Sequence, residues 1–477
     1  MRRSHLQTIV LSMVVMSVVC TPPLPAQFER FLKDSTFRFD YFHTGTKGEE
    51  RISGDKMYEE GAWAGSTTNL LDTLNLGDYF FEVIDVTSNR ILFSRGYSSL
   101  FDEWQTTDEA LAGTYRTFHE SVRFPYPYSK FQLRISRRNK QMVFNEIFST
   151  VIDPNGIEIH HEKPRADANV VDIFLNGDSH GKVDIVILGD GYTKGEMPKF
   201  RSDVRHFIDV LFNTEPFKRR KKDFNVRAIE VTSRESGINQ PDQNIWVGNA
   251  LGTTYNSFGS ARYVLTDANS VVRDFAASVP YDFLFILVNA KRYGGGGIFQ
   301  LYAISFSTGE TAETAWQADY VFVHEFGHSF AGLGDEYYAS SVAYNEFYQK
   351  GVEPWEPNIA ATISRQGLKW RDFVQAETAL PTSWNKTLYD SMETERGKLR
   401  RDEKGYAEKR QAILNAERQV LDDKQSRGIV GAFEGAGYSS AGLYRPSLDC
   451  RMFSLSLTDF DPVCARAINR MIDFYSK

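Results

Sequence analysis

Residues 321–338 read VFVHEFGHSFAGLGDEYY, and they place His324, Glu325 and His328 in the pattern HExxH, followed by Gly332. Apolar residues recur at helical spacing through this stretch, which predicts a helix that ends at the glycine. Side chains four positions apart share one face of a helix, so both imidazoles can reach a single ion. The pattern indicates a catalytic zinc site, because such sites use three protein ligands and keep one position open for water.

The third ligand follows from the positions of the histidines. The chain has 9 histidines and none of them follows His328, so a histidine downstream of the motif is impossible. Asp335 is the predicted third ligand and Glu336 is its competitor, since either carboxylate can bind zinc. Neighbouring residues of an extended segment point to opposite sides, so only one of the two can face the metal. Glu325, about 100° around the helix, is predicted to be the general base that deprotonates the water which zinc binds and acidifies.

Length and composition limit the class of protein. A chain of 477 residues is long for one hydrophobic core and favours two or three domains, and 42% hydrophobic with 14% aromatic residues indicates a globular protein. The net charge is −7, with a pI near 5.8. Non-specific binding of nucleic acid needs clustered positive charge, so we expect no nucleic-acid partner.

The amino terminus has the pattern of a secretory signal peptide at residues 1–26. A basic start precedes an apolar stretch at 9–19 and a small-residue cleavage pattern that leaves Gln27 as the first mature residue. The apolar stretch is shorter than the roughly 20 residues that span a membrane, so no stable membrane insertion is expected. The protein is therefore predicted to be secreted, periplasmic or at the cell surface. A lipoprotein anchored through Cys20 is the alternative, although Val19 is a poor fit before a lipidated cysteine.

Cleavage leaves Cys450 and Cys464 as the remaining cysteines. In an exported protein they are predicted to form a disulfide, which would close a loop of about 15 residues worth roughly 3 kcal/mol. Two buried thiols are the alternative.

The remaining chain divides into two parts. Residues 27–160 alternate short β-prone runs, such as 79–86, with turn signals, which predicts an antiparallel β-sandwich that serves as an accessory domain. Residues 161–477 alternate apolar runs such as 183–190 with helix-like segments, which predicts an α/β catalytic domain and makes the whole chain a multidomain α+β protein. The charge-rich stretch 391–427 is predicted to be an exposed helical insertion.

Six stretches of the second half carry a resemblance to a known family. In order along the chain they are VDIVILGDGYT at 183–193, SRESGINQP at 233–241, RYGGGGI at 292–298, HEFGHSFAGLGDEY at 324–337, EPWEPNI at 353–359 and YRPSLDCRM at 444–452. Together they resemble the IgA-peptidase-like family of secreted bacterial zinc metallopeptidases, whose members also carry an amino-terminal β-domain.

The resemblance implies a metzincin-like catalytic domain with an HExxH active-site helix. It gives Met452 the role of the methionine turn, which lies beneath the zinc ligands without binding the metal. The chain departs from the usual metzincin pattern in two respects. Gly332 follows His328 by four residues, where three is typical, and a carboxylate replaces the third histidine.

The expected function is hydrolysis of peptide bonds in a protein or peptide substrate, with zinc held by His324, His328 and Asp335. Immunoglobulin A is a possible substrate through the resemblance, but specificity lies in cleft loops, so the substrate stays open. Tyr337, Tyr338 and Tyr444 are the candidates for stabilising the oxyanion.

Two other functions are compatible with the pattern. One is a secreted glycan- or protein-binding protein with a structural zinc site, and the other is a zinc amidase that acts on cell-wall peptides. Glu325 argues against the first, because a structural site needs no general base and normally has four protein ligands.

Overall fold

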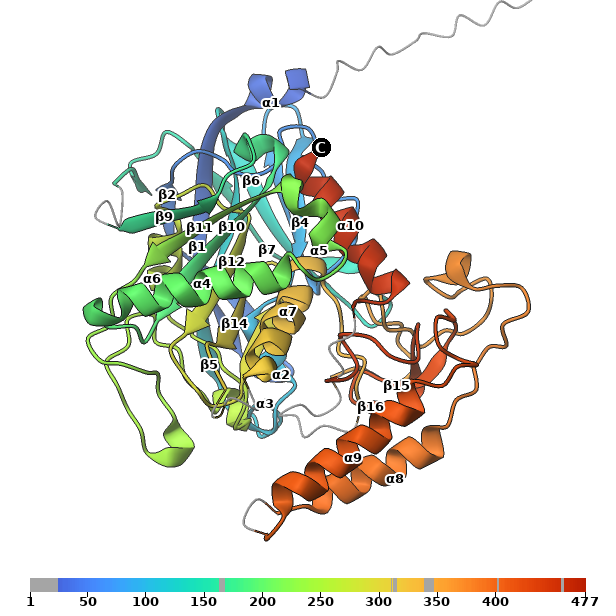
Figure 1. Cartoon of the computed structure of the whole chain (residues 1–477). Coiled ribbons are helices and arrows are strands. Elements are labelled where there is room, and N and C mark those ends of the chain that lie inside the picture. The colour runs from blue at the N-terminus through green and yellow to red at the C-terminus, as the bar shows by residue number, and fades with distance from the viewer. Residues whose placement is uncertain are drawn as a thin grey trace, which may run out of the picture.

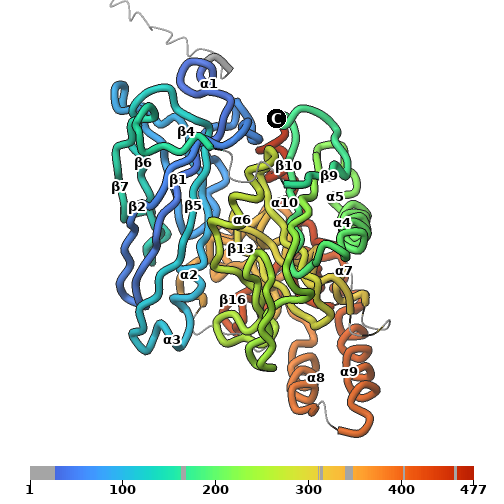
Figure 2. The backbone as a smooth tube through the Cα atoms, turned by 90° about the vertical axis from the view of Figure 1, so that its left-hand side faces the viewer, coloured from blue at the N-terminus to red at the C-terminus, as the bar shows by residue number. Residues whose placement is uncertain are grey.

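The structure is a computed structural model that describes residues 25–162, 168–309, 311, 315–338, 347–400, 403–455 and 459–477. The chain forms two bodies, an amino-terminal β-body and a larger body built around a mixed sheet, which overlap in the view of Figure 1 and lie side by side in Figure 2. The predicted signal peptide falls almost wholly outside the described residues. Within the described ranges, no helix is both long enough and apolar enough to cross a membrane.

The amino-terminal body consists of two four-stranded sheets that share one core. Its first sheet has the order β5 (Arg116–Pro127), β1 (Leu32–Gly45), β2 (Glu50–Glu59), β8 (Ile159–His160), and its second sheet β4 (Arg90–Tyr97), β3 (Tyr79–Asp85), β6 (Phe131–Arg138), β7 (Phe144–Ile152). Phe37 of β1 lies 5.1 Å from the ring of Phe124 in β5 and 5.3 Å from the ring of Phe131 in the other sheet. Alternate side chains of each strand therefore meet between the sheets.

Short helices accompany these sheets. They are α1 (Pro25–Phe31), α2 (Leu100–Gln105) and α3 (Asp108–Leu111). The β-strand pattern of the sequence did not predict α2 and α3. Both begin at a residue whose side-chain oxygen caps the helix, Ser99 for α2 and Thr107 for α3. This local capping supports short helices inside a region of strand propensity.

The second body is built on a six-stranded sheet. Its order is β13 (Gly295–Ile298), β14 (Tyr302–Phe306), β12 (Phe283–Val288), β10 (Val183–Asp190), β11 (Phe224–Glu230), β9 (Asn169–Phe174). The four inner strands are parallel, and the edge strands β9 and β13 run antiparallel to their neighbours. All residues of β10 are buried, as expected for a parallel strand covered on both faces.

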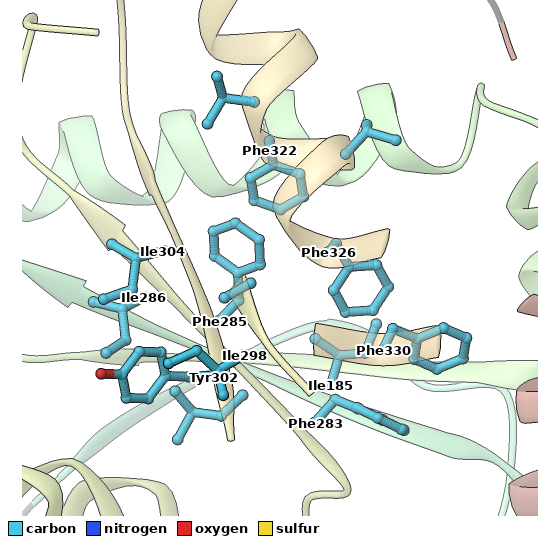
Figure 3. Packing of buried hydrophobic residues seen from close by; sticks show 14 of the residues in the cluster. Ile185, Phe283, Phe285, Ile286, Ile298, Tyr302, Ile304, Phe322, Phe326 and Phe330 are labelled. Atoms are coloured by element: carbon cyan, nitrogen blue, oxygen red, sulfur yellow. The ribbon is translucent and has the colours of Figure 1, made fainter. Parts of the chain in front are cut away.

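Helices cover both faces of this sheet. In Figure 2, α6 (Asn269–Ala276) lies between the sheet and the amino-terminal body, whereas α4 (Met197–Leu211) lies on the far side. The helix α7 (Trp316–Ala331) also packs on the sheet, and Figure 3 shows Phe322, Phe326 and Phe330 directed toward its core. The ring of Phe322 stacks 4.0 Å from that of Phe285 in β12. One face of α7 is thereby fixed against the sheet.

The remaining elements complete the second body. The helices and strands among them are α5 (Phe217–Arg220), α8 (Lys386–Lys398), α9 (Tyr406–Leu421), β15 (Phe433–Ala436), β16 (Ser439–Arg445) and α10 (Pro462–Ser476). Single turns of 3-10 helix occur at Ser179–Gly181, Lys194–Glu196, Lys221–Asp223, Pro241–Gln243, Ser257–Gly259 and Arg371–Phe373. The pair α8 and α9 projects from the body as a helical hairpin (Figure 1). The hairpin covers the charge-rich stretch 391–427, and its first helix begins before that stretch, at Lys386.

The sequence therefore predicted the mixed α+β organisation correctly, but the predicted disulfide is wrong. Cys450 and Cys464 are free thiols with their Sγ atoms 3.8 Å apart, whereas a disulfide bond is about 2.0 Å long. The physical reason lies in the neighbours of Cys464, whose thiol donates a hydrogen bond to Glu336 Oε1 at 3.3 Å.

Candidate active site

The helix α7 places the two histidines of the motif on the side opposite Phe322, Phe326 and Phe330, where His328 lies next to the edge strand β13. Its last turn ends at Gly332, which has a φ of 61°. This left-handed conformation suits glycine and lets the chain reverse. The reversal brings Asp335 back to the histidines, so that its Oδ1 lies 3.0 Å from His324 Nε2 and 3.2 Å from His328 Nε2. The two Nε2 atoms are 3.2 Å apart.

Backbone carbonyls fix the orientation of both imidazoles. The Nδ1 of His324 is 3.1 Å from the carbonyl oxygen of Arg451, and the Nδ1 of His328 is 2.5 Å from that of Leu333. A carbonyl oxygen can only accept, so each Nδ1 carries the hydrogen and donates it. In the neutral rings, each Nε2 then presents its lone pair to the space beside Asp335, which is the tautomer that a metal-binding histidine needs.

The three residues fit a divalent metal ion. Asp335 is 6% exposed, and its Oδ1 is buried without a hydrogen-bond partner among the described residues, while its Oδ2 accepts a hydrogen bond of 2.5 Å from the Tyr438 hydroxyl. Two imidazole nitrogens and one carboxylate oxygen that lie close enough to share one ion form a donor set that zinc accepts. The oxygen that lacks a hydrogen bond is the one directed at both histidines.

Electrostatic coupling within this group is strong. Burial alone would raise the pKa of Asp335, but His328 and His324 hold it well below its usual range. Burial alone would lower the pKa of His328, but the adjacent Asp335 raises it to about 9. An anionic carboxylate between the imidazoles thus favours a positive charge at this point, whether a proton or a metal cation supplies it.

Glu325 lies on the cleft side of the same helix and is half-buried. Burial raises its pKa, and the two histidines act in the opposite direction. The glycines of β13 allow the edge strand to approach the helix closely. A Cβ atom at Gly295 would lie 3.1 Å from Glu325 Cγ, and one at Gly297 would lie 2.4 Å from the Glu325 carbonyl oxygen. The glycine run of the sequence therefore serves close packing against α7.

Met452 is fully buried beneath the helix. A Cβ atom at Gly327, which lies one residue before His328, would be 3.1 Å from Met452 Sδ. The carbonyl oxygen of Met452 accepts a hydrogen bond of 2.9 Å from the backbone N–H of Glu336. Its neighbour Arg451 supplies the carbonyl that orients His324. The segment around Met452 thus supports both the helix and the loop that carries Asp335.

The structure distinguishes the two acids that the sequence left in competition. Asp335 faces the histidines, whereas Glu336 is fully buried on the other side of the loop and accepts a hydrogen bond of 2.9 Å from Asn358 Nδ2. The alternation expected for neighbouring residues of an extended segment accounts for this separation.

The three tyrosines proposed as oxyanion partners occupy different places. Tyr337 lines the cleft, with its ring 6.3 Å from that of His324, and its hydroxyl accepts a hydrogen bond of 3.3 Å from Arg262 Nη2. The Tyr338 hydroxyl donates to Asp390 at 2.7 Å, and Tyr444 is not among the residues that line the cleft. The structure therefore favours Tyr337.

Three further residues at the site were not identified from the sequence. Tyr320 lies one helical turn before His324 and donates a hydrogen bond of 2.9 Å to the Arg451 carbonyl, and its spacing on the helix was a usable signal. Arg262 and Tyr438 come from distant segments, and nothing in the local sequence marks them.

A cleft of about 980 Å³ surrounds this group. Its walls include parts of the amino-terminal body, the region of β13 and α7, the loops that carry Arg262 and Tyr337, and the α8–α9 hairpin. Contributing residues include Asp78, Asp102, Gly295, Glu325, Arg396 and Glu417. A cavity of this size lies at the upper end of the range for small-ligand pockets, so it offers room for an extended substrate.

Two histidines one helical turn apart, a glutamate beside the first of them and a nearby carboxylate, all on the wall of a cleft, form an arrangement that is typical of metal-dependent peptidases. The chain belongs to the IgA Peptidase M64 family, whose model matches residues 171–472. A second model, described as the Peptidase M64 N-terminus, matches residues 27–149. The predicted resemblance is thereby confirmed, and the protein is a peptidase. No curated protein matches the chain.

Proposed function

We propose that this protein is a secreted zinc-dependent endopeptidase. The observation that carries the proposal is the convergence of His324 Nε2, His328 Nε2 and Asp335 Oδ1 beside Glu325 on the wall of a large cleft. Secretion rests on the signal-peptide pattern at residues 1–26. The zinc assignment rests on the donor set, because imidazole and carboxylate ligands with an open position are typical of catalytic zinc.

His324, His328 and Asp335 would hold the ion, which would supply a Lewis acid and a water of lowered pKa. Glu325 accepts a proton from the attacking water and passes it to the nitrogen of the leaving amine. Its half-buried position, with a pKa raised by burial, suits a group that must both accept and release a proton. Carbonyls on Arg451 and Leu333 keep the imidazoles oriented throughout.

Tyr337 is the proposed hydrogen-bond donor to the developing oxyanion. Its hydroxyl lies at the cleft, accepts a hydrogen bond from Arg262 and interacts with the Asp335 carboxylate, so its O–H would turn from that carboxylate to the substrate oxygen. The neighbouring guanidinium adds positive charge where the carbonyl oxygen of the substrate would become negative.

We also propose a finer description of the two bodies. The two amino-terminal sheets, joined by contacts such as Phe37 with Phe131, are assigned as a β-sandwich with an accessory role in substrate binding, because Asp78 and Asp102 reach the cleft. The second body is assigned as metzincin-like, with Met452 as its methionine turn. Immunoglobulin A is the first host protein to test, since the family name points to it.

The decisive variant is Glu325→Gln, which keeps the shape of the side chain and removes the base. We expect kcat/KM on a peptide library to fall by about 10²–10⁴-fold, with the metal content of the unsubstituted protein retained. Asp319→Asn is the matched control, because it removes a carboxylate from the same helix but outside the residues that line the cleft. Full activity in Glu325→Gln would exclude the proposed mechanism.

Two further measurements complete this experiment. Tyr337→Phe is expected to lower kcat with little change in KM, since a contact made only in the transition state affects the chemical step. Digestion of immunoglobulin A and of other secreted host proteins, with the cut sites mapped by mass spectrometry, identifies the substrate. Cleavage at chain ends only would contradict the endopeptidase assignment.

A further inference from the structure

A second group of metal-ligand side chains lies behind the loop that carries Asp335. It consists of Glu336, Cys450, Asp461 and Cys464, and no member is more than 6% exposed. One ligand atom from each residue lies within 4.8 Å of the other three. Glu336 comes from the loop after α7, Cys450 from the segment before Met452, and the other two from the start of α10. Three separate segments of the chain therefore meet at this point.

Each carboxylate of this group has one buried oxygen that accepts no hydrogen bond from an N–H or hydroxyl group in the described part of the chain, and the two acids interact with each other. Asp461 Oδ1 caps α10 by accepting hydrogen bonds from the backbone N–H groups of Val463 at 2.7 Å and Cys464 at 2.9 Å. The unsatisfied atoms are Asp461 Oδ2 and Glu336 Oε2, and both are buried. Two adjacent buried acids that face two thiols are unfavourable as anions unless a proton or a cation offsets their charge, and an ion held by all four side chains would supply it.

The spacing of the sulfur atoms also fits a bound ion. The Sγ atoms of Cys450 and Cys464 are 3.8 Å apart. Two thiolates bound to one tetrahedral zinc ion at about 2.3 Å each are separated by about 3.8 Å. A disulfide would need them about 2.0 Å apart. The observed arrangement therefore matches two ligands of one ion more closely than a disulfide.

We propose that Glu336, Cys450, Asp461 and Cys464 bind a second, structural zinc ion. Thiolate ligands select zinc over magnesium and calcium, and carboxylates complete the set. Four protein ligands leave no open position, which is typical of structural rather than catalytic zinc. The fully buried Arg445 attracts the carboxylate of Glu336 and offsets one of the two negative charges by which two thiolates and two carboxylates exceed a divalent ion.

The position of this site gives it a role in the active site. Glu336 follows Asp335 directly, and its backbone N–H donates to the Met452 carbonyl at 2.9 Å. The ion would tie α10 and the segment before Met452 to the loop that delivers Asp335 to the histidines. Asp335 itself remains a ligand of the first site, so the two sites are coupled through adjacent residues without sharing a ligand.

The test is the metal content of the purified full-length chain and its variants, measured by elemental mass spectrometry. We expect about two zinc ions per chain in the unsubstituted protein, and about one in Cys464→Ser, in Cys450→Ser and in His328→Ala. The double variant Cys464→Ser with His328→Ala should retain almost none. The control is Ile468→Val, which changes a fully buried residue of α10 that has no metal-ligand atom. This variant should keep both ions.

Cobalt substitution provides a measurement that does not depend on the cysteine variants folding. The unsubstituted protein and His328→Ala, loaded with cobalt(II), should both show sulfur-to-cobalt charge-transfer absorption, because the histidine site contains no sulfur. One zinc ion per chain together with no such absorption would overturn the proposal. So would an intact mass that is lower by two hydrogen atoms, which reports a disulfide. Peptidase activity enters none of these readouts, so the proposed catalytic mechanism can fail independently.

Discussion

At the scale of single residues, the site depends on which atoms are already engaged. Each histidine donates its Nδ1 hydrogen to a backbone carbonyl, so its Nε2 is the atom that faces Asp335. The two oxygens of Asp335 also have different neighbours. Oδ2 accepts a hydrogen bond from the Tyr438 hydroxyl, and Oδ1 faces the imidazoles. Hydrogen bonds to the outer atoms of the ligands thus leave the inner atoms available for an ion.

Tyr438→Phe tests whether the hydrogen bond to Asp335 Oδ2 supports metal binding by this carboxylate. Loss of the hydroxyl removes the donor to Asp335 Oδ2, and we expect the affinity for the catalytic metal to fall by about 10–100-fold. The measurement is the concentration of chelator that halves peptidase activity. Tyr444→Phe, in the adjacent strand β16 and outside the cleft-lining residues, should leave that concentration unchanged. Equal chelator sensitivity of Tyr438→Phe and the unsubstituted protein would refute the supporting role.

At the scale of elements, the position of α7 follows from the close approach of β13 on one side and the aromatic contacts with the sheet on the other. The aromatic face is visible in the sequence as phenylalanines spaced by four, and Phe326 and Phe330 stack 5.1 Å apart along it. The approach of β13 depends instead on missing side chains. Gly297 faces the backbone of Glu325 and the Cβ of His328, so no larger residue fits without moving the helix.

Gly297→Ala tests that approach. The added methyl would lie 2.4 Å from the Glu325 carbonyl oxygen, and relief of the clash must displace the strand or the helix. We expect a loss of about 1–3 kcal/mol in the free energy of unfolding and a lower kcat, both measured against Gly397→Ala. Gly397 lies in α8, where an added methyl would have nothing within 4 Å, so its substitution should be neutral or slightly stabilising. Similar stability of the two variants would count against the packing argument.

At the scale of the whole molecule, the two bodies are joined by charged and aromatic contacts. Arg38 of β1 is fully buried; its Nη1 is 3.0 Å from Glu60 Oε1 and its Nη2 is 2.9 Å from Asp274 Oδ1 in α6. Arg123 of β5 is 3.0 Å from Glu60 and donates to the Tyr281 carbonyl of the second body at 3.1 Å. The amino-terminal walls of the cleft are held in place by this interface.

Arg38→Ala and Asp274→Asn separate the two roles of this network. Removing the arginine leaves the buried carboxylates of Asp40 and Glu60 less compensated, so we expect a loss of about 3–5 kcal/mol in the free energy of unfolding. Asp274 is 26% exposed at its side chain, so its neutralisation should cost no more than about 1 kcal/mol. Urea unfolding followed by circular dichroism measures both. Equal losses of unfolding free energy in the two variants would contradict this expectation. They would show that Arg38 stabilises the protein mainly through its ion pair with Asp274 across the interface.

Much of the fold was predictable because the relevant signals are local. Strand alternation predicted the amino-terminal sheets, and uniformly apolar runs such as 183–190 predicted the buried parallel strands. The short helices α2 and α3 were missed because the prediction followed the strand pattern of the whole region. Locally, the capping residues Ser99 and Thr107 stabilise helices against this weak strand pattern. The helical stretch predicted at 391–427 begins too late, because it was recognised by its charge and the helix α8 begins before the charge-rich residues.

The sequence by itself determined the helix and the placement of His324, Glu325 and His328 on it, and it predicted that a carboxylate completes the site. Only the tertiary structure separated Asp335 from Glu336, brought Arg262 and Tyr438 to the site and left Cys450 and Cys464 as free thiols beside two acids. The physical reason is the distance along the chain over which each determinant acts. Helical periodicity and the list of residue types act within a few residues, whereas the direction of a loop carboxylate depends on contacts between segments more than a hundred residues apart.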